Sequence, residues 1–229
     1  MMYYVCKYTP IELFAGFGQN CVLMDETPEN FDLADRAAHA NLCGFGKSVI
    51  QTALSGGAEE LILVNCCDTM RRVYDVIRDS GKCRFLYLLD LPYVSGCCQQ
   101  EQLAENLLRL KDAFAAYSGK PFVREAFLAS FSAAENVSGP YAAILGVRTG
   151  RELEERVRRA LPLSVRNLTC TGNRSVFLEK LPEDTPEETL FRAYAAALLG
   201  QTPCRRMDEH SERSAQYRDP NLRGVIFHS

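Results

Sequence analysis

The chain has 229 residues and a formal net charge of -3, which allows one large domain or two small ones, each with its own core. The acidic balance argues against nucleic acid as the main partner, because phosphate binding needs a basic surface, and no apolar run approaches the roughly 20 residues that span a bilayer. The first residues lack the charged head and apolar stretch of a signal peptide, so we expect a cytoplasmic protein with reduced thiols and no membrane contact.

Strands and helices alternate along the first part of the chain. A helix is expected to start at Thr9, as the N-cap, with Pro10 in its first turn. Continuous apolar runs predict buried strands, and apolar residues at helical spacing predict the helices between them. The expected strands are 21–24, 60–64 and 84–89, and the expected helices are 31–40, 47–54, 69–78, 101–117 and 122–134. This alternation indicates a parallel βαβ architecture.

The segment 135–140, Glu-Asn-Val-Ser-Gly-Pro, is the best candidate for a domain boundary. Beyond it the pattern restarts, with strands expected at 141–147, 165–169 and 224–227 and helices at 152–161 and 187–199. We therefore predict an α/β protein with two Rossmann-like parallel-sheet α/β/α domains. The first spans 1–135, and the second, expected to be incomplete, spans 140–229.

Two adjacent cysteines follow the central strand of the first predicted domain. Cys66 and Cys67 come after the apolar run 60–64 and open the next helix. Ligands bind beyond the carboxyl ends of strands in open α/β sheets, and a helix N-terminus favours a thiolate. Of the two, Cys67 is the better candidate ligand or nucleophile, because it lies nearer the helix and neighbouring side chains diverge. Cys66 is the second choice.

A third cysteine, Cys43, opens the preceding helix and can converge with Cys67 on one edge of the sheet. Two thiolates make half of a soft metal site, suited to zinc or to an iron–sulfur cluster. Short-spaced Cys-x-x-Cys pairs are absent, which weighs against a structural zinc ribbon. The alternative is that both cysteines are buried structural thiols. The segment is not a P-loop, because Asn41 stands where that motif requires glycine.

Two arginines lie one turn into the helix that Cys67 opens. Arg71 and Arg72 could hold an anionic ligand such as a phosphate-bearing coenzyme, and a solvated or salt-bridged helix face is the equal alternative. Cys97 and Cys98 are expected to lie in a loop without a specific role. We expect core packing for the two cysteines in short apolar runs, Cys21 and Cys83.

Three motif segments occur in the same order in one known family: residues 6–13, 41–48 and 65–75, the last containing Cys-Asp-Thr-Met-Arg-Arg. The chain resembles the 2-hydroxyacyl-CoA dehydratase D-component family, which also includes benzoyl-CoA reductase subunits and double-cubane cluster proteins. The resemblance continues into the second half of the chain through residues 169–174, 202–207 and 222–226.

The resemblance implies a [4Fe–4S] cluster held between two Rossmann-like domains by three cysteines, with Cys43 and Cys67 in two of the ligand positions. It also implies an ATP-dependent activator protein, whose low-potential electron the cluster passes to an acyl-CoA thioester for radical dehydration. A homo- or heterodimer is typical of similar proteins.

The third ligand of similar proteins has no counterpart here, because no cysteine follows Cys204. The first hypothesis is an iron–sulfur lyase of this family. The second is a non-catalytic, C-terminally truncated homologue or a split subunit, which carries the cluster or acts as a scaffold and needs a second chain. A cysteine-dependent redox or zinc protein is the third. The sequence leaves open whether the isolated chain is an active enzyme.

Overall fold

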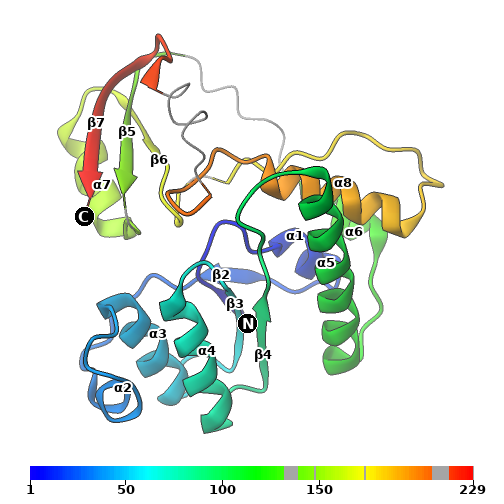
Figure 1. Cartoon of the computed structure of the whole chain (residues 1–229), viewed down its shortest axis with the longest axis horizontal. Coiled ribbons are helices and arrows are strands. Elements are labelled where there is room, and N and C mark those ends of the chain that lie inside the picture. Colours follow the sequence, from blue (N-terminus) through cyan, green and yellow to red (C-terminus); the bar gives the residue numbers. More distant parts are fainter. Residues whose placement is uncertain (132–138, 147, 173, 208–216, 229) are drawn as a thin grey trace. The chain divides into compact units, whose positions relative to one another are not determined.

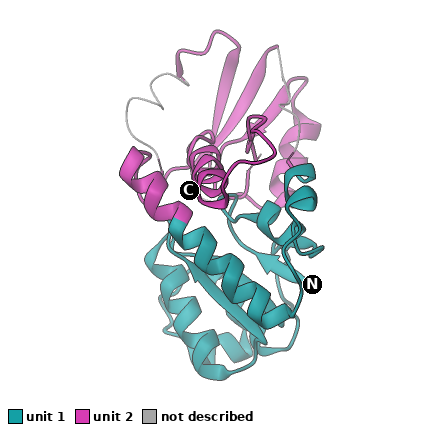
Figure 2. Cartoon of the chain, turned by 90° about the vertical axis from the view of Figure 1, so that its right-hand side faces the viewer, with its two compact units in different colours: residues 1–91, 105–130 teal, residues 92–104, 131–229 magenta. Residues whose placement is uncertain are grey.

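The computed structural model describes residues 1–131, 139–146, 148–172, 174–207 and 217–228 (Figure 1). Two units divide the chain: Met1–Leu91 with Glu105–Ser130, and Pro92–Ala104 with Phe131–Ser229 (Figure 2). The boundary expected at 135–140 falls mainly on residues 132–138, which lie outside the described residues. The expected domain limits therefore stay a prediction.

Four parallel strands form the sheet of the first unit: β1 (Met2–Tyr4), β2 (Cys21–Leu23), β3 (Glu60–Val64) and β4 (Phe85–Leu89). Their order is β2-β1-β3-β4. All five residues of β3 are buried, as expected for a parallel strand covered on both faces. Because β2 and β3 lie on opposite sides of β1, the carboxyl ends of β1 and β3 form a topological switch point, where α/β proteins commonly bind ligands.

Helices cover both faces of this sheet (Figure 1). On one face α4 (Asp68–Ser80) contacts β3 and β4, and α3 (Gly44–Leu54) packs beside it. On the other face Phe114 of α5 (Cys97–Ser118) meets Phe85 edge-on, with ring centroids 5.2 Å apart. Leu88, which points away from Phe85 because side chains alternate along a strand, lines a cavity beside α4. The remaining helices of this unit are α1 (Ile11–Ala15), α2 (Asp32–Ala37) and α6 (Arg124–Ala129).

Several helices begin elsewhere than predicted. Helix α3 begins at Gly44 and not at residue 47, so Cys43 directly precedes it. Helix α1 begins at Ile11, and Pro10 takes the N-cap position with a ψ of 69°, so Thr9 is not the cap. Helix α5 begins at Cys97, which puts Cys97 and Cys98 in its first turn and not in a loop. Residues 97–104 of α5 belong to the second unit and residues 105–118 to the first. Neither α5 nor any other helix in the described part of the chain is long and apolar enough to cross a membrane.

The second unit contains a parallel sheet of order β6-β5-β7, made by β5 (Tyr141–Gly146), β6 (Ser164–Asn167) and β7 (Leu222–His228). Helix α7 (Arg151–Ala160) packs on β6, and α8 (Glu187–Leu199) follows. Gly146 has a φ of +111°, and a Cβ on it would lie 1.9 Å from the His228 carbonyl oxygen. Only glycine allows β5 and β7 to approach this closely.

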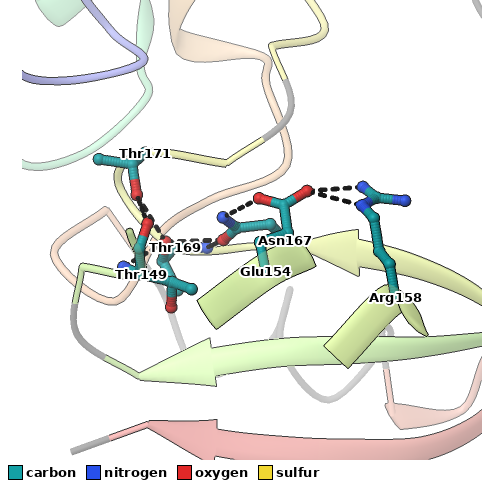
Figure 3. A network of polar contacts seen from close by, with 6 residues as sticks. All are labelled: Thr149, Glu154, Arg158, Asn167, Thr169 and Thr171. Carbon is teal, nitrogen blue, oxygen red and sulfur yellow. Dashed lines mark hydrogen bonds and ion pairs between the residues drawn. The ribbon is translucent and has the colours of Figure 1, made fainter. Parts of the chain in front are cut away.

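A hydrogen-bond network ties α7 to the ends of β5 and β6 (Figure 3). The buried Asn167 side chain accepts from the Thr169 backbone N–H at 3.0 Å and donates to Glu154 of α7 at 2.7 Å. Thr169 Oγ1 in turn accepts from the Thr149 N–H at 3.3 Å, and Thr171 Oγ1 donates to the Thr149 carbonyl oxygen at 2.6 Å. Buried polar groups are costly when unpaired, so this network stabilises the segment that follows β5.

Candidate metal centre

Cys67 lies at the junction of β3 and α4. It is the N-cap of α4, with extended φ and ψ of -162° and 167°, and it is exposed. A hydrogen bond from the Cys66 thiol lowers the pKa of Cys67 to about 6, against partial burial, which acts in the opposite direction. The backbone N–H groups of Thr69 and Met70 add to this effect without completing a capping hydrogen bond. Cys67 is therefore mostly thiolate at neutral pH, the form that binds metals.

Behind Cys67 lies a row of two further thiols. Cys66 is half-buried and contacts both Cys6 and Cys67, and these hydrogen bonds together with burial raise the pKa of Cys66. Cys6, which is buried, follows β1 by two residues, as Cys66 follows β3, and β1 and β3 are parallel neighbours. Cys66 is thus placed as a protonated donor to Cys67. The sequence reasoning did not assign a role to Cys6, because only the strand order brings it beside Cys66.

Cys43 is the N-cap of α3 and is exposed. Its sulfur accepts a hydrogen bond from the Gly46 backbone N–H at 3.5 Å. Both Cys43 and Cys67 are therefore thiols at the N-terminus of a helix, where the helix dipole favours negative charge. Neither is a buried structural thiol.

The first turns of α3 and α4 are in contact. Gly46 lies so close to α4 that a Cβ on it would be 2.6 Å from Thr69 Cγ2. Because Cys43 and Cys67 cap these two turns, the contact brings both exposed thiols to the same end of the helix pair.

A cavity of about 530 Å³ lies beside α4 at the carboxyl ends of β3 and β4, within the size range of small-molecule sites. Two hydrogen bonds hold the Asn65 side chain in this lining: it accepts from the Leu91 N–H at 2.9 Å and donates to Asp90. The residues that line the cavity are Asn65, Arg71, Arg72, Tyr74, Asp75, Leu88 and Asp90.

The two arginines of the cavity differ in their partners. Arg72 pairs with Asp75 at 3.5 Å, and its side chain is 76% exposed. The guanidinium of Arg71, in contrast, has neither a hydrogen bond nor an ion pair with any residue that the structure describes. A guanidinium that lines a cavity and makes no ion pair can bind an anionic group of a ligand. Arg72 fits the salt-bridged alternative, and Arg71 fits the ligand-binding one.

Three further cysteines, Cys83, Cys97 and Cys98, have surroundings of their own. Cys83 donates to the Ala58 carbonyl oxygen at 3.1 Å, and burial raises its pKa to about 11, as befits a packing thiol. Cys97 and Cys98 are exposed in α5, with their sulfur atoms 3.9 Å apart. Across the described ranges, no three His, Cys, Asp or Glu side chains are arranged to hold a metal ion. Cys43 and Cys67 could therefore supply only part of a coordination sphere.

Comparison with known proteins adds one match. The family described as 2-hydroxyglutaryl-CoA dehydratase, D-component, matches residues 6–138, which is more than half of the chain. The matched range includes Cys43 and Cys67 and both arginines of the cavity. No curated protein matches the chain. Because the match ends at residue 138, the resemblance noted in the second half stays a prediction.

Proposed function

Because the chain belongs to the 2-hydroxyglutaryl-CoA dehydratase D-component family, we propose that Cys43 and Cys67 hold a [4Fe–4S] cluster. The observation that supports this most is the contact between the first turns of α3 and α4, each capped by an exposed cysteine. Iron–sulfur clusters are held by thiolates, and the lowered pKa of Cys67 favours that form without a metal. The two side chains therefore suit two of the ligand positions.

A bound cluster would supply one-electron chemistry for an acyl-CoA thioester, and an ATP-dependent activator protein would provide the electron. The chain's own groups bind and orient. Arg71 holds an anionic part of the acyl-CoA, and Arg72 contributes once its exposed pair with Asp75 opens, which costs ~1 kcal/mol or less. Asn65 and Asp90, hydrogen-bonded to each other, offer polar contacts on the wall of the same cavity.

A second candidate function is a non-catalytic cluster carrier or scaffold, or one subunit of an enzyme completed by another chain. What favours it is that, among the described residues, no three His, Cys, Asp or Glu side chains are arranged to hold a metal ion. In this case the remaining ligand comes from a partner in a homo- or heterodimer. The lyase and a carrier that binds the cluster alone or as a homodimer share the same two thiol ligands, so both make the same prediction for iron binding. A subunit completed by a different chain should bind the cluster only when that chain is present.

Anaerobic reconstitution with iron and sulfide tests the shared prediction. The wild-type protein should become brown and bind iron and sulfide in a fixed ratio, and a Cys43→Ser/Cys67→Ser variant should not. The matched control is Cys97→Ser/Cys98→Ser, which changes a second pair of exposed thiols and should bind as the wild type does. A colourless wild type, or equal iron in both variants, would overturn the proposal.

A second experiment distinguishes the lyase from the carrier. The reconstituted protein is mixed with activator, ATP and a 2-hydroxyacyl-CoA, and the enoyl product is measured by chromatography. Product formation that depends on Cys67 supports the lyase. An intact cluster that accepts the activator's electron and forms no product supports the carrier.

A further inference from the structure

Gly46 is a residue at which the first turn of α3 touches the first turn of α4. It is buried in the first turn of α3, where its N–H donates to Cys43. A Cβ on it would lie 2.6 Å from Thr69 Cγ2 and 3.3 Å from Leu42. The need for glycine is one of space, since the φ of Gly46 is not positive. Gly44, two residues earlier in the same turn, would place its Cβ in open space.

Each side of this contact leads directly to one of the exposed thiols. Gly46 binds the Cys43 sulfur through its N–H, and Thr69 is two residues from Cys67, whose sulfur it faces with its backbone and side chain. The Gly46–Thr69 contact therefore joins a residue bonded to the Cys43 sulfur to a residue bonded to the Cys67 sulfur.

Helix α3 is held on its other side by α2. Gln51 Oε1 accepts from the backbone N–H groups of Leu33 at 2.9 Å and Ala34 at 3.1 Å, which are otherwise unpaired at a helix start. Lys47 pairs with Asp35 at 2.7 Å. Because these contacts with α2 hold α3 in place, an added methyl group at position 46 would either separate the first turns of α3 and α4 or break the contacts with α2.

We propose that Gly46 is a positioning residue that sets the separation of the Cys43 and Cys67 sulfur atoms. Carbon atoms pack at about 3.5–4.0 Å, so a side chain at 46 requires a shift of roughly 1 Å. Metal–ligand distances in proteins hold to about 0.2 Å, which is several times smaller. The inference rests on the proposed role of the two cysteines as cluster ligands, but the separation of the thiols can be measured without iron.

The first experiment uses the full chain without metal, in a Cys97→Ser/Cys98→Ser background. Dibromobimane bridges nearby thiols, and peptide mass spectrometry identifies the bridge between Cys43 and Cys67. The Gly46→Ala variant should form this bridge at least about tenfold more slowly, because misplacement by ~1 Å can cost ~100-fold in rate. The Gly44→Ala control adds the same methyl group to the same turn and should match the background protein.

The Gly46→Ala/Thr69→Ser variant removes the methyl group that the new Cβ would meet and keeps the hydroxyl beside Cys67. It should restore the rate of bridging to within about twofold of the background protein. Such a rescue would not occur if Gly46→Ala slowed bridging only by destabilising the fold. It also keeps the test decisive if Gly46→Ala alone fails to fold. Normal bridging in Gly46→Ala, or no rescue in a folded double variant, would overturn the inference.

The second experiment measures iron retention against a chelator after anaerobic reconstitution. Gly46→Ala should hold iron about 10–100-fold more weakly, the loss typical when a group that orients a ligand is changed, and Thr69→Ser should restore it. A wild type that takes up no iron refutes the proposed function, and the bridging rates still decide the role of Gly46. Equal iron retention in wild type and Gly46→Ala refutes the positioning role alone.

Discussion

The Cys66→Ala substitution should raise the pKa of Cys67. The hydrogen bond from the Cys66 thiol is the largest influence on Cys67, whose pKa falls from 9.0 to about 6. Because a lowered pKa enlarges the thiolate fraction at any pH below the ordinary value, wild-type Cys67 should be about 50% thiolate at pH 6, where an ordinary thiol has ~0.1%. Alanine removes the donor and should move the titration midpoint back toward 9.

Reactivity follows thiolate fraction and intrinsic nucleophilicity together. A drop of three pKa units lowers the nucleophilicity of the thiolate roughly 20-fold, since the Brønsted coefficient is about 0.4–0.5. The net advantage of Cys67 over an ordinary thiol is therefore about 20-fold at pH 6 and about 4-fold at pH 7. The order should reverse between about pH 7.5 and pH 8.

The assay is alkylation of the metal-free protein by iodoacetamide between pH 5 and pH 10, followed for the Cys67 peptide by mass spectrometry, with N-acetylcysteine as the reference thiol. Cys66→Ser, which keeps a donor, is the matched control and should move the midpoint less than Cys66→Ala. Cys83, with a pKa of about 11, should stay unreacted through most of the range. A wild-type midpoint near 9, or one that Cys66→Ala leaves unchanged, would refute the reasoning.

Three stability predictions follow from packing in the two units. Gly146→Ala should destabilise the second unit by about 3 kcal/mol, because the Cβ collides with the His228 carbonyl oxygen at a positive φ, and hydrogen exchange should rise in β7. Asn167→Ala should cost about 1–3 kcal/mol in urea denaturation, since it leaves the buried Thr169 groups without their acceptor. Phe114→Ala should cost about 3–5 kcal/mol by thermal denaturation, because its ring is buried among other aromatic rings of the first unit. Losses below 1 kcal/mol would contradict each of them.

Elements with strong periodic signals were predicted with correct ends. The β3 strand at Glu60–Val64 and the α8 helix at Glu187–Leu199 match the sequence expectation. In β3 every residue is apolar after Glu60, and in α8 the buried Leu190, Tyr194 and Leu198 recur at helical spacing. The two parallel sheets likewise follow from the alternation of strands and helices.

The features of the site that could not be predicted from the sequence depend on contacts between elements that are far apart along the chain. The predicted start of this helix at residue 101 was wrong, since α5 begins at Cys97. Ser-Gly-Cys-Cys resembles a turn, although the Gln and Glu residues that follow favour a helix. The contact of Cys6 with Cys66 depends on β1 lying beside β3. The order of strands along the sequence does not specify their order in the sheet. The need for glycine at position 46 likewise depends on the packing of α3 on α4.

Helix α5 interleaves the two units along the chain. Its residues up to Ala104, including the buried Leu103, belong to the second unit, whereas Phe114 lies in the core of the first. A single cut at residue 135 would therefore produce two damaged fragments. Fragment 1–135 would retain residues 92–104 without the rest of their unit, and fragment 140–229 would lack that segment and its ion pair between Glu101 and Arg192. We expect both fragments to aggregate when expressed separately, and to recover solubility only when they are produced together.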